Sequence, residues 1–164
     1  MKTALYPGSF DPVTLGHLDI IRRASLIFDK VVVLVMKNRE KTPMFSTEER
    51  MELIRKSVAE FPNVEVATTE LLFAEYAKSF DDPVIVKGLR AVSDFEYEFQ
   101  IALINRKMNP QLDTVFLTSS EKYTFLSSTA VKEMAAYGAD LSEFVPAEII
   151  GDVMDKTTNR RQTQ

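Results

Sequence analysis

The side chains best placed to do chemistry lie in the segment 6–17, Tyr-Pro-Gly-Ser-Phe-Asp-Pro-Val-Thr-Leu-Gly-His, which holds the only histidine of the 164-residue chain. A short apolar run precedes the segment and an amphipathic helical pattern follows it. Gly8 lets the backbone approach an anion closely, and Ser9 adds a hydroxyl beside its own N–H. A strand, a glycine-bearing turn and a helix N-terminus in this order predict a phosphate site.

His17 ends this segment in the first turn of the predicted helix, where the positive end of the helix dipole disfavours protonation of the free imidazole. A lone histidine is more often a surface or capping residue. The surrounding Gly-x-Phe-Asp-Pro-x-x-x-Gly-His pattern favours a chemical role instead. A Thr-x-Gly-His motif inside such a turn indicates nucleotidyl transfer rather than simple nucleotide binding.

Two groups of cations follow other predicted strands, at the edge where an open parallel sheet collects its ligands. Lys41 lies between a buried strand and a capped helix, a position that favours a cation able to swing over a ligand. Lys87 and Arg90 flank Gly88 after another strand, and this arrangement suits a phosphate clamp in which arginine makes bidentate contacts. Alone, the Lys41 group is equally well explained as a solvated loop, and the Lys87 and Arg90 group is better explained as a charged turn. The predicted phosphate site therefore decides the interpretation.

A run of hydroxyl side chains, Ser127, Ser128 and Thr129, opens a later helix. It offers hydroxyls and unpaired backbone N–H groups, which together form an anion site. Capping the helix requires only one of the three residues, so the run favours ligand binding.

Composition excludes several other chemistries. The chain has no cysteine and one histidine, which rules out thiolate catalysis, disulfides and Cys- or His-rich metal sites. It also has no P-loop, no Gly-x-Gly-x-x-Gly turn and no Gly-x-Ser-x-Gly elbow. The net charge of −4 gives no global argument for nucleic acid or a membrane surface. We therefore expect chemistry by positioning and charge stabilisation, without a covalent intermediate. We find no leader sequence and no apolar run of about 18 residues, and so expect a cytoplasmic protein.

Alternating β-branched runs and helical patterns must position these groups. The expected strands are 2–6, 31–36, 64–68, 83–87 and 113–118, and the expected helices are 15–28, 47–60, 71–79, 94–108, 128–137 and 146–156. This order predicts a doubly wound, Rossmann-like α/β fold, a five-stranded parallel sheet with helices on both faces. We expect one domain over residues 1–156 and a flexible C-terminal tail over 157–164.

Local signals mark three helix starts. Ser46-x-x-Glu49 and Ser93-x-x-Glu96 match capping boxes, and Thr14 is a plausible N-cap for the helix that carries His17.

The helix 94–108 is apolar on two faces. Its stripes are Phe95, Phe99, Ala102 and Leu103 on one side, and Tyr97, Ile101, Ile104 and Met108 on the other. Such a helix needs cover on both sides, so we expect a homo-oligomer. A second helix of the same chain is an equally simple source of that cover.

Four strings in the chain resemble the bacterial phosphopantetheine adenylyltransferases, members of the nucleotidyltransferase superfamily that carries the Thr-x-Gly-His motif. They are the segment 6–17, Pro-Met-Phe-Ser-Thr-Glu-Glu-Arg, Gly-Leu-Arg-Ala-Val-Ser-Asp-Phe-Glu-Tyr-Glu and Leu-Ser-Ser-Thr-Ala-Val-Lys-Glu. The similarity runs in order from about residue 3 to about residue 150. It implies transfer of the adenylyl group of ATP to 4′-phosphopantetheine, which gives 3′-dephospho-coenzyme A and pyrophosphate. It also implies a Mg²⁺ requirement, with the ion held mainly by ATP phosphates and water, and a homohexamer.

The resemblance further implies roles for individual residues. His17, helped by Lys41, stabilises charge on the α-phosphate while the acceptor attacks it directly and in line. The implied ATP-binding residues are Ser9, Phe10, His17, Gly88, Leu89, Arg90, Glu98, Tyr123, Thr124, Phe125, Leu126, Ser127, Ser128 and Thr129. The implied acceptor-binding residues are Ser9, Lys41, Phe73 and Lys87. Lys87 departs from the family pattern, which commonly has an arginine there.

Three alternatives remain open at this point. A nicotinate-mononucleotide adenylyltransferase or a cytidylyltransferase would share the Thr-x-Gly-His turn, and the 87–98 string is the feature that favours phosphopantetheine. An ATP-binding sensor module would share the fold and bind ATP without releasing pyrophosphate.

Overall fold

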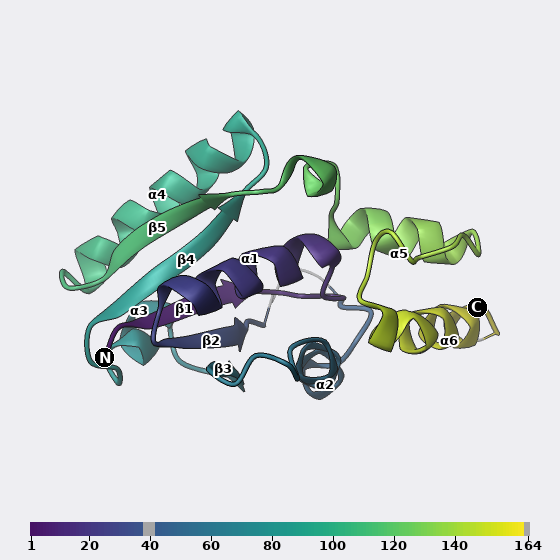
Figure 1. Cartoon of the computed structure of the whole chain (residues 1–164), viewed down its shortest axis with the longest axis horizontal. Helices are drawn as coiled ribbons and strands as arrows, with labels where there is room; N and C mark the ends of the chain where they lie inside the picture. The colour runs from purple at the N-terminus through teal and green to yellow at the C-terminus, as the bar shows by residue number, and fades with distance from the viewer. Residues whose placement is uncertain (38–41, 163–164) are drawn as a thin grey trace.

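The computed structural model describes residues 1–37 and 42–162, and its centre is a five-stranded parallel sheet with strand order β3-β2-β1-β4-β5. The strands are β1 (Thr3–Gly8), β2 (Lys30–Val35), β3 (Val64–Thr68), β4 (Pro83–Leu89) and β5 (Asp113–Thr118). The predicted doubly wound, Rossmann-like architecture is confirmed (Figure 1).

The three central strands are apolar on both faces because helices cover both. Val31, Val33 and Val35 of β2 belong to one core cluster, while Val32 and Leu34 belong to a second on the opposite face. Unbroken β-branched runs are typical of such doubly covered parallel strands. The edge strands β3 and β5 are more exposed.

Helices α1 (Leu15–Ile27) and α2 (Thr47–Ser57) pack in the first core cluster, whereas α3 (Phe73–Ala77) packs in the second, beside α4 (Val92–Met108). Helices α5 (Ser128–Ala136) and α6 (Ile150–Gln162) lie side by side beyond the end of the sheet to which the β1 and β2 arrows point (Figure 1). Two short 3₁₀ turns, η1 (Glu121–Tyr123) and η2 (Ala147–Ile149), precede α5 and α6.

Two of the three predicted helix starts are confirmed. Thr14 caps α1, and Ser46 with Glu49 forms a reciprocal capping box on α2. The predicted box of Ser93 and Glu96 is wrong, because α4 begins at Val92 and has no side-chain cap.

The last helix also ends later than predicted. Helix α6 continues past residue 156 to Gln162, and Thr157 is buried, with its hydroxyl donating to the Val153 carbonyl. Residue 156 is therefore not the end of the last helix.

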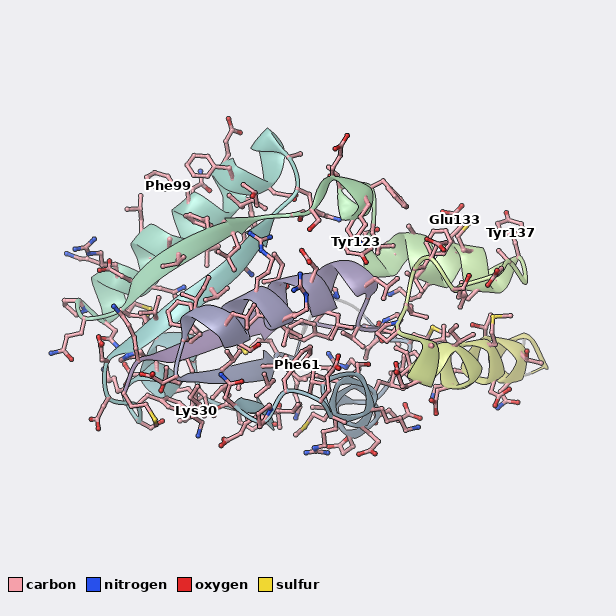
Figure 2. The ribbon with its side chains drawn as sticks, viewed as in Figure 1. Lys30, Phe61, Phe99, Tyr123, Glu133 and Tyr137 are labelled. Atoms are coloured by element: carbon pink, nitrogen blue, oxygen red, sulfur yellow. The ribbon has the colours of Figure 1, made fainter. Side chains whose placement is uncertain are left out.

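Helix α4 presents both apolar stripes partly to the outside. Phe99 is 45% exposed and Tyr97 is 64% exposed, and Figure 2 shows Phe99 pointing away from the sheet. Within residues 1–37 and 42–162, no second helix of the chain covers this outer face. No described helix has both the length and the apolar character needed to cross a membrane.

Candidate active site

A cavity of about 250 Å³ opens beyond the carboxyl ends of β1 and β4. Its walls come from the β1–α1 segment, the start of α1, the first turns of α4 and the loop after β5. The predicted site residues that line it are Phe10, His17, Lys87, Gly88, Arg90, Glu98, Tyr123, Leu126, Ser127 and Ser128. Residues from three separate stretches of sequence, 6–20, 87–98 and 119–128, therefore meet at one place.

His17 is held by the turn that begins α1. The backbone N–H of Thr14 donates to Nδ1 of His17 at 3.1 Å, and the backbone N–H of His17 donates to the Thr14 hydroxyl at 3.2 Å. Because the Thr14 N–H can only donate, Nδ1 carries a lone pair and the proton of the neutral ring sits on Nε2. The turn thus selects the tautomer in which Nε2 is a hydrogen-bond donor.

The electrostatics of the cavity keep this ring neutral. Burial lowers the pKa of His17 to about 4, and the positive charges of Arg90 and Lys87 act in the same direction. The sequence predicted the direction of this shift from the helix dipole, whereas burial is its largest cause. At neutral pH the imidazole is an uncharged Nε2–H donor.

Phe10 packs against the histidine. Its ring makes edge-on contacts with His17, at 5.0 Å between centroids, and with Tyr6, at 5.3 Å. A Cβ atom added to Gly8 would lie 2.8 Å from the Phe10 ring, so glycine is required for the ring to fold back over the strand end. Phe10 is 2% exposed, so the residue is almost fully packed although it contributes to the cavity wall.

Lys87 forms an ion pair inside the cavity. Its Nζ lies 3.1 Å from a carboxylate oxygen of Glu98 and 3.5 Å from the Pro7 carbonyl. Because Lys87 is paired with Glu98, a ligand phosphate that reaches Lys87 must compete with Glu98 for the ammonium.

Tyr6 lines the same wall of the cavity. Burial and the negative charge of Glu98 raise the pKa of Tyr6 well above its usual value.

Arg90 connects two walls of the cavity. Its guanidinium donates to the Leu126 carbonyl at 2.9 Å and to the Asp94 carboxylate at 3.1 Å. Asp94 also accepts from the Arg90 backbone N–H, the contact that replaces the predicted side-chain cap of α4. These contacts fix the orientation of the Arg90 guanidinium at the cavity wall.

The hydroxyl run after β5 has a mixed outcome. Ser127 caps α5 by accepting from the Ala130 N–H, and Ser128 donates to the Pro12 carbonyl at 2.7 Å. Tyr123 points from η1 toward the start of α1, with its Cβ 3.5 Å from the position of a Cβ on Gly16 (Figure 2). Both serines line the cavity, and Ser128 also connects the start of α5 to the β1–α1 segment.

Several predicted residues do not line the cavity: Ser9, Phe73, Leu89, Thr124, Phe125 and Thr129. Phe73 is buried in the second core cluster, on the face of the sheet opposite His17, because it opens the helix that covers that face. Lys41 falls outside the residues that the structure describes.

The structure adds Tyr6, Thr14, Asp94 and Ser119 to the cavity wall. Thr14 and Asp94 could have been found, since one is an N-cap and the other lies four residues after Arg90, at ion-pair spacing. Tyr6 and Ser119 have only their positions at the ends of strands as signals.

The carboxylates of the cavity bear on whether the protein itself could bind a metal ion there. Within residues 1–37 and 42–162, no cluster of three His, Asp or Glu side chains could hold a metal ion. The cavity carboxylates Glu98 and Asp94 are each paired with a cation. Phosphate oxygens of a nucleotide would therefore have to supply most ligands of a Mg²⁺ ion.

A family model described as cytidylyltransferase-like matches residues 5–134, which places the chain among the nucleotidyltransferases. The chain is 53% identical over 156 residues to a phosphopantetheine adenylyltransferase of Caldanaerobacter subterraneus subsp. tengcongensis, covering 95% of this chain and 98% of the relative. It is 50% identical over 161 residues to one of Lachnoclostridium phytofermentans, covering 98% and 99%. The chain belongs to the phosphopantetheine adenylyltransferase family.

A solved structure supports the fold independently. A chain from Vibrio parahaemolyticus, described provisionally as a nicotinate-nucleotide adenylyltransferase, superposes with a TM-score of 0.71 at 17% identity. The alignment covers 93% of this chain and 98% of that one. At this identity the comparison bears on architecture alone.

Proposed function

We propose that this protein transfers the adenylyl group of ATP to 4′-phosphopantetheine, releasing pyrophosphate and 3′-dephospho-coenzyme A, a step of coenzyme A biosynthesis. The names of relatives with about half of their residues identical support this activity. The observation that carries the mechanism is the neutral His17, whose Nε2–H is the donor left free by the Thr14 contact.

In this mechanism a phosphate oxygen of the acceptor attacks the α-phosphorus in line, and the bond to the leaving pyrophosphate breaks. Negative charge grows on the α-phosphate oxygens, where His17 donates a hydrogen bond through Nε2. A donor aimed at developing charge in a partly dry cavity stabilises the transition state more than the ground state. His17 therefore contributes without gaining or losing a proton.

The remaining charged residues bind the ends of the two substrates. Arg90, held by Asp94 and Leu126, binds the phosphates of ATP that leave as pyrophosphate. Lys87 leaves its ion pair with Glu98 and binds the acceptor phosphate instead. Glu98 can then contact the nucleotide. Lys41 helps His17 at the α-phosphate. Mg²⁺, if held by the ATP phosphates and water, would neutralise part of the phosphate charge.

The chain is further proposed to form a homo-oligomer, a hexamer, through α4. Phe95, Phe99 and Leu103 are 43%, 45% and 54% exposed along one side of this helix. Burial of such a stripe against a second copy removes the apolar surface from water. The ATP-dependent activity favours the cytoplasm as its location.

The direct test is release of pyrophosphate from ATP, Mg²⁺ and 4′-phosphopantetheine. We expect turnover with ATP and 4′-phosphopantetheine. We expect none when nicotinate mononucleotide replaces this acceptor, and none from CTP with a phosphorylated acceptor of the cytidylyltransferases. Turnover only with nicotinate mononucleotide would move the protein to the other adenylyltransferase class. Tight ATP binding without pyrophosphate from any acceptor would make it an ATP sensor.

A further inference from the structure

Two charged residues outside the cavity are almost fully buried. Arg50 of α2 is 3% exposed, and Asp11 of the β1–α1 segment is 6% exposed. Burying a charged side chain is costly unless hydrogen bonds replace its water. Neither residue lines the cavity, so direct contact with a ligand there does not explain them.

The guanidinium of Arg50 joins three backbone segments. Nη1 donates to the Ser9 carbonyl at 2.7 Å and to the Met36 carbonyl at 3.2 Å. Nε donates to the Ser46 carbonyl at 3.3 Å, and Nη2 donates to the Thr47 hydroxyl at 3.1 Å. Arg50 therefore connects the start of α2 to the end of β2 and to the residue just before Phe10.

The carboxylate of Asp11 makes the reciprocal connection. Its oxygens accept from the backbone N–H groups of Met44 and Phe45, both at 2.9 Å. One of them also accepts from Lys132 of α5 at 3.2 Å. Figure 1 shows α2 and α5 on opposite sides of the segment that joins β1 to α1. Asp11, the residue just after Phe10, is thus connected to the segment that leads into α2 and to α5.

Phe10 itself has a backbone conformation that needs such support. Its φ of +47° lies in the left-handed region, which residues other than glycine seldom adopt. A strained residue of this kind persists where its surroundings determine its conformation from several directions. Here the carbonyl before it and the side chain after it are both fixed by hydrogen bonds, and its ring lies against His17.

We propose that Arg50 and Asp11 are positioning residues that hold Phe10 in its left-handed turn from both sides and thereby set its ring against His17. Their effect on turnover rests on the proposed function. Their effect on His17 does not, because the environment of that ring can be measured without any substrate.

The single histidine of the chain gives a direct readout, since its imidazole signals in an NMR titration need no assignment. In Arg50→Met and Asp11→Asn, the pKa of His17 is expected to rise from about 4 toward its ordinary 6.5 as the loosened turn admits water. Arg55→Met is the matched control, because Arg55 lies on the same helix, is 51% exposed and pairs only with Glu52 among the described residues. Its His17 pKa should equal that of the wild type.

The kinetic readout separates positioning from stability. Both variants should lower kcat by about 10²-fold, because a shift of about 1 Å at a reacting centre has that effect. The KM for ATP should change less than about threefold. Arg50→Lys keeps the charge but lacks the planar fork, so it should reproduce both effects, and it replaces Arg50→Met if circular dichroism shows that variant unfolded.

A folded variant with wild-type His17 pKa and kcat would overturn the proposal, even with a lowered melting temperature. If the wild type releases no pyrophosphate, the proposed function fails, and the titration still decides the positioning roles.

Discussion

The backbone N–H of Thr14 lies 3.1 Å from Nδ1 of His17 and completes a capping box in which the histidine side chain takes the place usually held by glutamate. One contact thus serves the helix and the chemistry together. It satisfies an otherwise unpaired N–H of α1, and it places the ring proton on Nε2.

Replacing His17 by alanine removes that donor. If the Nε2–H acts mainly on the transition state, kcat should fall about 10²–10³-fold, or roughly 3–4 kcal/mol, as for other lost donors to developing oxyanions. The affinity for ATP should change far less. Steady-state kinetics together with calorimetric ATP titration measure both quantities. Equal losses in rate and affinity would show instead that His17 is a ground-state contact.

The lowered pKa of His17 predicts a pH dependence of stability. The folded value is about 4 and the ordinary value is 6.5, so the unfolded chain binds the proton more readily between these values. The free energy of unfolding contributed by this group is therefore fully present above pH 6.5 and is lost as the pH falls toward 4. At about 1.4 kcal/mol for each pKa unit, the loss is on the order of 3 kcal/mol.

Other groups titrate in the same range, so the effect of His17 must be measured as the difference in stability between the wild type and a variant without the imidazole. His17→Asn retains an oxygen that can accept from the Thr14 N–H but has no proton to gain. Urea unfolding of both proteins at several pH values should give curves that diverge only below about pH 6.5. Parallel curves down to pH 4 would mean that the folded His17 protonates normally.

Local sequence patterns were sufficient to predict the helices and strands and two of the helix caps. The strands of the sheet and the Thr14 and Ser46 caps depend on residues adjacent in sequence, so periodicity and capping rules find them. The start of α4 depends on Asp94, which turns to Arg90 because Arg90 is itself held by the distant Leu126. Propensity gives no information on that choice.

Long-range contacts explain the rest of what the sequence did not predict. Arg50 follows two glutamates and has the pattern of a solvated helix charge, yet its partner Ser9 lies 41 residues away. Phe73 is the first residue of α3, which covers the second face of the sheet. The sequence alone does not show which face of the sheet a helix covers. Lys87 and Arg90 were predictable at the cavity because parallel topology brings the end of β4 to the same edge as the end of β1.

Gly8 is predicted to be intolerant of a methyl group. In Gly8→Ala the new Cβ would lie 2.8 Å from the Phe10 ring, so the ring must move off His17. We expect a loss of about 1–3 kcal/mol of stability, accompanied by a fall in kcat.

Gly151→Ala in α6 is the internal control, since its Cβ meets nothing within 4 Å. That change should stabilise the protein by about 0.5–1 kcal/mol. Thermal unfolding of the two variants should therefore shift in opposite directions.

The exposed stripe of α4 predicts the assembly state. Phe99 is 45% exposed, stacks on Phe95 at 5.5 Å and points away from the sheet (Figure 2). Phe99→Lys places a charge in the centre of the proposed interface, where an unpaired cation loses its water without compensation. Sedimentation velocity should show the wild type as a hexamer and this variant as a monomer or a smaller species. Tyr137→Lys at the C-cap of α5 is the control, because Tyr137 is 81% exposed and points outward at the end of another helix (Figure 2). A wild type that sediments as a monomer would refute the proposed interface, and disruption by Tyr137→Lys alone would move it to α5.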